Sequence, residues 1–155
     1  MQSAIENGRN KGGELSHEFE PRIVAFCCNY SAYAAADLAG ALRLTYPPNV
    51  RIIRVPCSGK VEMAYLLKVI EDGADGVMVV GCLEGDCHHL DGNLRAKKRV
   101  EAAKRTMKKI GIEPDRVEMR NLCSAMADKL ADVMREMTER VRKLGPSPLR
   151  EGVAR

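Results

Sequence analysis

The sequence contains no tryptophan, only four tyrosines and two phenylalanines, and no long apolar run. So few aromatic side chains argue against a protein that stacks nucleic-acid bases. The longest apolar run, residues 76–82, is much shorter than the roughly 18 residues that a membrane-spanning helix needs. We therefore expect neither a nucleic-acid partner nor a membrane span.

The N-terminal segment lacks the apolar core of a secretory signal, which predicts a cytoplasmic protein. Residues 1–20 are polar and acidic, and we expect them to form a flexible tail. The remainder of the 155 residues is long enough for one domain with a real hydrophobic core. We place this domain at 21–145 and a second short tail at 146–155.

The excess of positive charge is small and local. The chain has a net charge of +4, but residues 91–111 alone hold eight basic and two acidic residues, so the rest is slightly acidic. Such a run typically forms the solvent-exposed face of a helix. The alternative is a docking face for an acidic partner, on a basic helix spanning 93–109.

Short apolar runs rich in β-branched residues alternate with patterns of helical period. The runs predict strands at 22–28, 50–56, 76–82 and 116–122. The helical patterns fall at 32–45, 61–72, 93–110 and 125–144. This alternation predicts a parallel sheet with right-handed crossovers. We therefore expect a small three-layer α/β domain, flavodoxin-like in outline, with about four strands in the order 2-1-3-4 and flexible tails at both ends.

The six cysteines are the strongest chemical signal. Each lies at the carboxyl end of an expected strand or in the loop that follows: Cys27, Cys28, Cys57, Cys82, Cys87 and Cys123. In an open parallel sheet these ends share the edge at which ligands bind. The neighbouring Cys27 and Cys28 point to opposite faces, so we expect one of the two to bind. Cys123 is expected to be a bystander.

Converging thiols suit several kinds of site. Zinc knuckles and redox disulfides commonly use C-x-x-C, and the chain has no such motif. Iron–sulfur clusters take about four thiolates at more variable spacing, and the C-x4-C spacing of Cys82 and Cys87 also occurs in plant-type ferredoxins. Buried core thiols without a ligand are the simplest alternative.

Small and polar residues surround the expected site. Gly81 and Gly85 let the backbone approach a cluster, and N–H groups there and at Ser58-Gly59 are suited to bonding its sulfurs. His88 and His89 are either ligands, as in Rieske-type centres, or polar loop residues.

Three segments carry a resemblance to a known family. They are FCCNYSAYAAADLAG at 26–40, YPPNVRIIRVPCSGKV at 46–61 and DGVMVVGCLEGDCHHLDGN at 75–93. The sequence resembles, over about residues 22–145, the iron–sulfur delta subunit of methyl-viologen-reducing hydrogenase, the partner of heterodisulfide reductase. The resemblance implies a 2Fe-2S cluster that relays electrons to the flavin of a heterodisulfide reductase A-type subunit. The electron-input enzyme would be a hydrogenase, a formate dehydrogenase or a methylene-tetrahydrofolate reductase module.

The resemblance also implies roles for particular residues. The cluster ligands would be Cys28, Cys57, Cys82 and Cys87, with Cys27 as an alternate. The residues that tune the cluster would be Asn29, Ser31, Ser58, Gly59, Gly85 and His88. Ser31 stands where the family often has a cysteine, so it either ligates through oxygen or caps the first helix.

Other functions remain open at this stage. A zinc-stabilised adaptor would hold one zinc ion and no acid-labile sulfide. A thiol–disulfide or flavin-dependent oxidoreductase is a further possibility, although the segment 29–32 lacks the donors that would cradle a flavin phosphate. A role in nucleic-acid binding would leave the placement of the cysteines unexplained.

Overall fold

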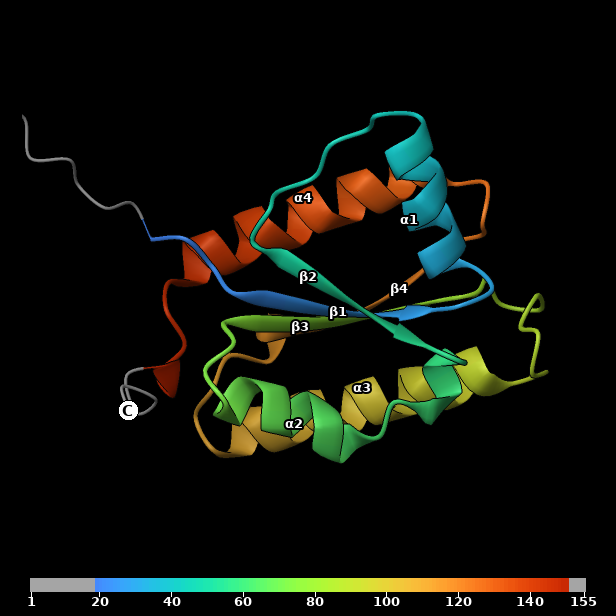
Figure 1. The fold of residues 1–155 in the computed structure, drawn as a ribbon. Coiled ribbons are helices and arrows are strands. Elements are labelled where there is room, and N and C mark those ends of the chain that lie inside the picture. The colour runs from blue at the N-terminus through green and yellow to red at the C-terminus, as the bar shows by residue number, and fades with distance from the viewer. Residues whose placement is uncertain (1–18, 151–155) are drawn as a thin grey trace, which may run out of the picture.

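A computed structural model describes residues 19–150 as a parallel sheet with helices on both faces (Figure 1). The strands are β1 (Ile23–Cys28), β2 (Val50–Val55), β3 (Gly76–Gly81) and β4 (Val117–Asn121). The helices are α1 (Ala32–Ala41), α2 (Met63–Glu71), α3 (Gly92–Lys109) and α4 (Ala127–Leu144), with short 3-10 turns η1 (Ser58–Lys60) and η2 (Pro114–Arg116). The strand order β2-β1-β3-β4 confirms the predicted α/β fold. None of the described helices is long and apolar enough to cross a membrane.

The two faces of the sheet bury different sets of side chains. Successive residues of β1 alternate between them, so Ala25 and Cys27 pack under α1 and α4 while Phe26 packs against α2 and α3. All six residues of β3 are buried, as the nearly continuous apolar run predicts for a strand covered on both sides. β2 forms one edge and is largely exposed. The sheet thus holds the carboxyl ends of β1 and β3 side by side at its centre.

Several element boundaries differ from the sequence prediction by one or two residues, and the end of the first helix differs by four. The first helix ends at Ala41 and not at Thr45, because Arg43 adopts a left-handed backbone with φ of 55° that turns the chain before the prolines. The last strand begins at Val117 because Arg116 belongs to η2. Of the predicted tails at 1–20 and 146–155, residues 1–18 and 151–155 lie outside the described residues.

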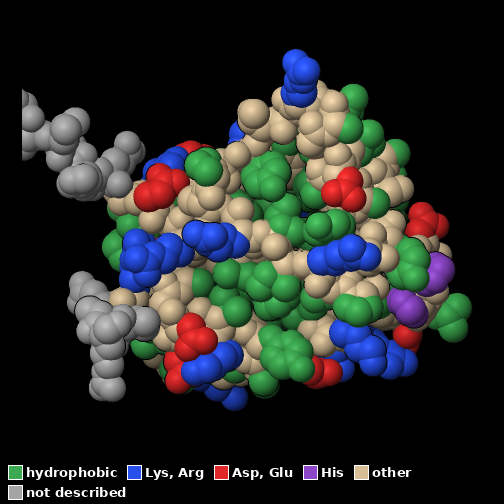
Figure 2. All heavy atoms as spheres, in the orientation of Figure 1, with side chains coloured by type: hydrophobic (Ala, Val, Ile, Leu, Met, Phe, Trp, Pro, Cys, Tyr) green, Lys and Arg blue, Asp and Glu red, His purple; other side chains and the backbone are tan. Residues whose placement is uncertain are grey.

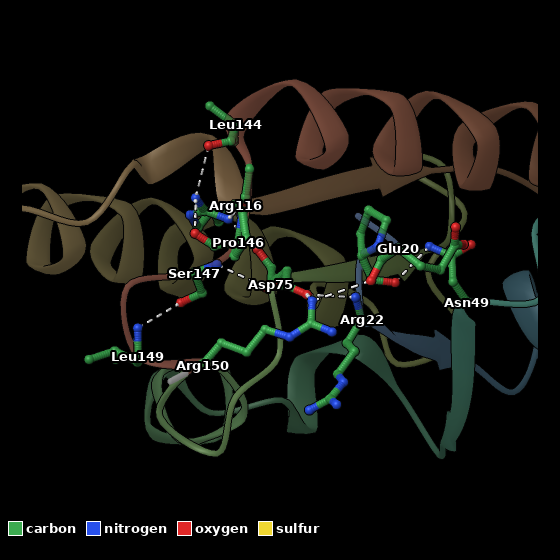
Figure 3. A network of polar contacts seen from close by, with 12 residues as sticks. Glu20, Arg22, Asn49, Asp75, Arg116, Leu144, Pro146, Ser147, Leu149 and Arg150 are labelled. Atoms are coloured by element: carbon green, nitrogen blue, oxygen red, sulfur yellow. Dashed lines mark hydrogen bonds and ion pairs between the residues drawn. The ribbon is translucent and has the colours of Figure 1, made fainter. Parts of the chain in front are cut away.

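The amino-terminal edge of the sheet is closed by a buried polar network (Figure 3). The Arg116 side chain is fully buried, and its guanidinium donates to the backbone oxygens of Leu144, Gly145 and Pro146 at the end of α4. It also donates to the Asp75 carbonyl and pairs with Glu113. A buried arginine therefore satisfies carbonyls that the end of a helix leaves without partners.

The carboxylate of Asp75 has three partners in two segments that are far apart in the sequence. It accepts hydrogen bonds from the amides of Arg22 and Ser147, each at 2.8 Å, and pairs with Arg150 at 2.7 Å. Residues 146–150, which the sequence places at the start of a tail, thus pack against the domain. Both ends of the described chain meet at this edge.

Replacing Asp75 with alanine is expected to lower the free energy of unfolding by roughly 2–4 kcal/mol, since buried donors lose their acceptor. Urea unfolding followed by circular dichroism measures the change. Asp72→Ala is the matched control, because that exposed carboxylate pairs only with the exposed Lys68. Equal stability of the two variants would contradict the role assigned to Asp75.

Candidate metal centre at the carboxyl edge of the sheet

Four cysteine side chains form a separate buried cluster at the carboxyl edge of the sheet. Cys28 ends β1, Cys57 precedes η1, and Cys82 and Cys87 begin and close the turn after β3. Between 1% and 9% of each residue is exposed. The structure thus brings together the four cysteines named from the sequence.

The four thiols are grouped as two pairs. The sulfur atoms of Cys28 and Cys82 lie 3.7 Å apart, and the Cys57 and Cys87 thiols are close enough to shift each other's pKa. Two sulfurs bound to one tetrahedral metal at about 2.3 Å lie about 3.8 Å apart. Within the described residues, no three His, Cys, Asp or Glu side chains are arranged around a single ion position. The Cys28–Cys82 pair already has the spacing of two ligands on one metal atom.

Two glycines allow the Cys57 side of the cluster to meet the Cys87 side. A Cβ atom on Gly92 would overlap the Cys57 sulfur and lie 3.3 Å from the Cys87 sulfur. A Cβ atom on Gly59 would lie 2.6 Å from the Cα of Gly92. Backbone without side chains at both positions is therefore a condition for this packing.

Burial and backbone amides act on the thiols in opposite directions. Burial raises the pKa of Cys57 and of Cys82. At Cys57 the Gly59 amide, 3.4 Å from the sulfur, opposes this rise. Burial acts in the same direction on Cys87, but the amides of His89, Gly92 and Asn93 outweigh it and lower that pKa. The last two amides open α3, where the helix dipole favours an anion. These amides therefore stabilise negative charge on the Cys87 sulfur.

The hydroxyls of Ser31 and Ser58 lie buried beside the cluster. Neither makes a hydrogen bond among the described residues. Ser31 lies close enough to Cys82 to lower the pKa of that thiol, against the larger effect of burial, but falls short of a hydrogen bond. Ser58 faces Gly81, where a Cβ would lie 2.8 Å from its oxygen. Buried hydroxyls normally have partners. Both are suited to donate to an anionic, sulfur-rich metal group, so the residues present fit such a group.

Residues that the sequence interpretation missed hold the loop in place. The side-chain amides of Asn93 and Asn121 both donate to the Cys82 carbonyl, at 3.0 and 2.6 Å. Arg99 of α3 donates to the Gly59 carbonyl at 2.5 Å and pairs with Glu62 at 2.9 Å, which ties η1 to α3. Asn93 falls inside the third family-like segment, whereas nothing in the sequence singles out Asn121 or Arg99.

The two remaining cysteines lie outside the cluster. Cys27 is in the core under α1 and α4, where burial raises its pKa to about 12. Cys123 is partly exposed and lines a surface hollow together with Cys82 and Ser31. Neither belongs to the group of four.

The other residues proposed to tune the site are placed as follows. Ser31 immediately precedes α1, but its hydroxyl makes no capping bond. Gly85 forms an open turn with φ of 90°, and a Cβ there would meet no atom within 4 Å. His88 stacks on Tyr30, and its amide partly opposes the rise that burial causes in the pKa of Cys82. Asn29 donates its backbone N–H to Val55, at the junction of β1 and β2.

The chain is similar in sequence to several known proteins. The chain is 49% identical over 131 residues to the vhu iron-sulfur subunit of the F420-non-reducing hydrogenase of Methanocaldococcus jannaschii, covering 84% of this chain and 98% of the relative. It is 46% identical over 132 residues to the iron-sulfur subunit of the F420-non-reducing hydrogenase of Archaeoglobus profundus, covering 85% and 96%.

A third relative is much longer. It is the A-type subunit of the ferredoxin/F(420)H(2)-dependent CoB-CoM heterodisulfide reductase of Methanosarcina acetivorans, 40% identical over 126 residues, which cover 81% of this chain but only 16% of the relative. The model of the methyl-viologen-reducing hydrogenase delta subunit family matches residues 23–145, which include all four clustered cysteines. On this match, and on the similarity to complete subunits, the chain belongs to the methyl-viologen-reducing hydrogenase delta subunit family.

Proposed function

We propose that the chain is an electron-transfer subunit that binds a 2Fe-2S cluster through Cys28, Cys57, Cys82 and Cys87. The observation that carries this proposal is the grouping of four buried thiols as two pairs. A cluster with two irons and four cysteine ligands takes two thiolates on each iron. The names of the hydrogenase relatives, which describe iron-sulfur subunits, support the same class of cofactor.

The protein's own groups have defined tasks in this function. When bound, the cluster takes up and releases one electron at a time. Burial of all four cysteines keeps water from the sulfurs. The Gly59 amide, together with the hydroxyls of Ser31 and Ser58, supplies donors that raise the reduction potential by stabilising negative charge on sulfur.

Two kinds of relative support the proposed partners. One kind is named as part of a hydrogenase, and the other as the A-type component of heterodisulfide reductase. We propose that the chain relays electrons to the flavin of a heterodisulfide reductase A-type subunit. The electron-input enzyme is a hydrogenase, a formate dehydrogenase or a methylene-tetrahydrofolate reductase module.

Anaerobic purification of the full chain is expected to give about two iron and two sulfide ions per chain, with an EPR signal only after reduction by dithionite. Serine at any of the four clustered cysteines should sharply reduce bound iron. Cys123→Ser is the control and should retain it, while Cys27→Ser tests the alternate ligand. One zinc ion and no sulfide would replace this proposal with the zinc-stabilised adaptor.

Gly92→Ala is expected to lower the iron content well below that of the wild type, because the added methyl group takes the position of the Cys57 sulfur. Gly40→Ala, in α1, is the matched control, since a Cβ there has no neighbour within 4 Å. Iron analysis and EPR report the site, and far-UV circular dichroism reports the fold. A Gly92→Ala chain with full iron and an unchanged EPR signal would refute the role given to this packing.

A further inference from the structure

The turn between β3 and α3 carries an exposed leucine beyond the buried thiols. In Figure 1 this loop extends past the end of the sheet, at the right of the view. Leu90 near its end is 88% exposed, the highest value among the large exposed hydrophobic residues of the described chain. Its amide donates to the Cys87 carbonyl at 2.9 Å, and the two residues form an isolated β-bridge. The leucine is thus fixed directly to a proposed cluster ligand.

The backbone of Leu90 is unfavourable for its side chain. Its φ of 66° lies in the left-handed region, which glycine and asparagine tolerate far better than leucine. Neither burial nor local backbone preference explains a leucine here. Strained, exposed residues of this kind cluster at binding sites, and the feature points to an external contact.

Three aromatic rings pack together in the segments next to the leucine. Tyr30 stacks on His88 with ring centroids 3.7 Å apart, and His89 meets both rings edge-on. Tyr30 is 47% exposed, so this arrangement forms surface. We name Tyr30, His88, His89 and Leu90 the docking tip. Packing of its rings orders the surface before any partner arrives, which reduces the entropy lost on binding.

The docking tip has basic surroundings. A hollow of about 280 Å³ beside His89 is lined by Lys60 and by two ion pairs, Arg95 with Asp91 and Arg99 with Glu62, so Lys60 supplies the excess positive charge. A second hollow on the same side brings Arg54 next to Tyr30 and His89. Figure 2 shows both basic (blue) and acidic (red) side chains near the purple histidines. An apolar centre with a basic rim is complementary to an apolar pocket with an acidic rim.

We propose that the docking tip is where the redox partner binds, with Leu90 entering an apolar pocket that is bordered by carboxylates. The proposal rests on the proposed function, since it takes the partner to be the flavoprotein that exchanges electrons with the cluster. The Asp75 and Arg116 network lies at the opposite edge of the sheet, away from the four cysteines. A partner seated on Leu90 lies next to Cys87, the most exposed of the four cysteines.

Leu90→Asn separates binding from folding, because asparagine suits the left-handed backbone while removing the apolar contact. The assay measures affinity for the purified heterodisulfide reductase A-type flavoprotein of the same organism by anaerobic calorimetry, and electron transfer from the reduced chain by stopped flow. We expect affinity to fall about tenfold or more. Iron content and the EPR signal should be unchanged, and the thermal midpoint should be equal or higher.

Ile110→Asn is the matched control, because Ile110 is 63% exposed at the far end of α3. It should bind as the wild type does. Unchanged affinity in Leu90→Asn would overturn the proposal while leaving the proposed function intact. A wild-type chain that holds the cluster but does not bind the flavoprotein would show that the assigned partner is wrong. A chain without the cluster would instead refute the proposed function.

The basic rim has its own test. Lys60→Glu should slow association with the flavoprotein, since charges at the rim of an interface act mainly on the association rate. The association rate should also depend less on salt concentration. Lys109→Glu, at the far end of α3, makes the same change of charge as a control and should have little effect. Equal effects of both variants would contradict a localised acidic partner face.

Self-association that Leu90→Asn abolishes, seen by sedimentation, would assign the docking tip to a second copy of the chain.

Discussion

The site depends on the contact between the backbones of Gly59 and Gly92. This contact lets η1, which follows β2, lie against the first turn of α3, which follows β3. Cys57 and Cys87 come from these two segments, so their sulfurs meet only if both backbones approach without side chains. Arg99 then ties η1 to α3 through the Gly59 carbonyl and Glu62. Gly59 and Gly92, which have no side chains, thus determine how closely the Cys57 and Cys87 sulfurs approach each other.

The two edges of the sheet have different properties. The amino edge is held by charge-assisted bonds of Asp75 and Arg116, both fully buried, and these bonds join segments far apart in sequence. The carboxyl edge instead holds buried serine hydroxyls without partners among the described residues and a leucine in the left-handed region. Such unfavourable features persist where the surrounding structure is rigid enough to maintain them. The amino edge is thus joined by hydrogen bonds within the chain, whereas the carboxyl edge keeps hydroxyl donors for a ligand.

The order of the strands and helices can be predicted from the sequence, because it depends on the spacing of apolar residues along short segments. Apolar runs and helical spacing give the elements, their alternation gives the parallel sheet, and the parallel sheet puts Cys28, Cys57 and Cys82 at one edge. The roles of Asn121 and Arg99 do not follow, since each depends on a carbonyl supplied by a distant segment. The sequence pattern places Arg116 in a strand and does not predict its buried hydrogen bonds, because it gives no sign that the end of α4 lies nearby. The identity of the ligands remains a prediction.

The network around Asp75 has a consequence for how the domain is combined with others. Because Asp75 binds Arg22, Ser147 and Arg150 at once, the chain enters and leaves the domain at one place, opposite the cysteines. Extra polypeptide can be joined at either end without covering the thiols. This geometry is compatible with gene fusion, and in Methanosarcina acetivorans a similar segment makes up 16% of a longer protein. The same fold can therefore serve as a separate polypeptide or as one module of a larger chain.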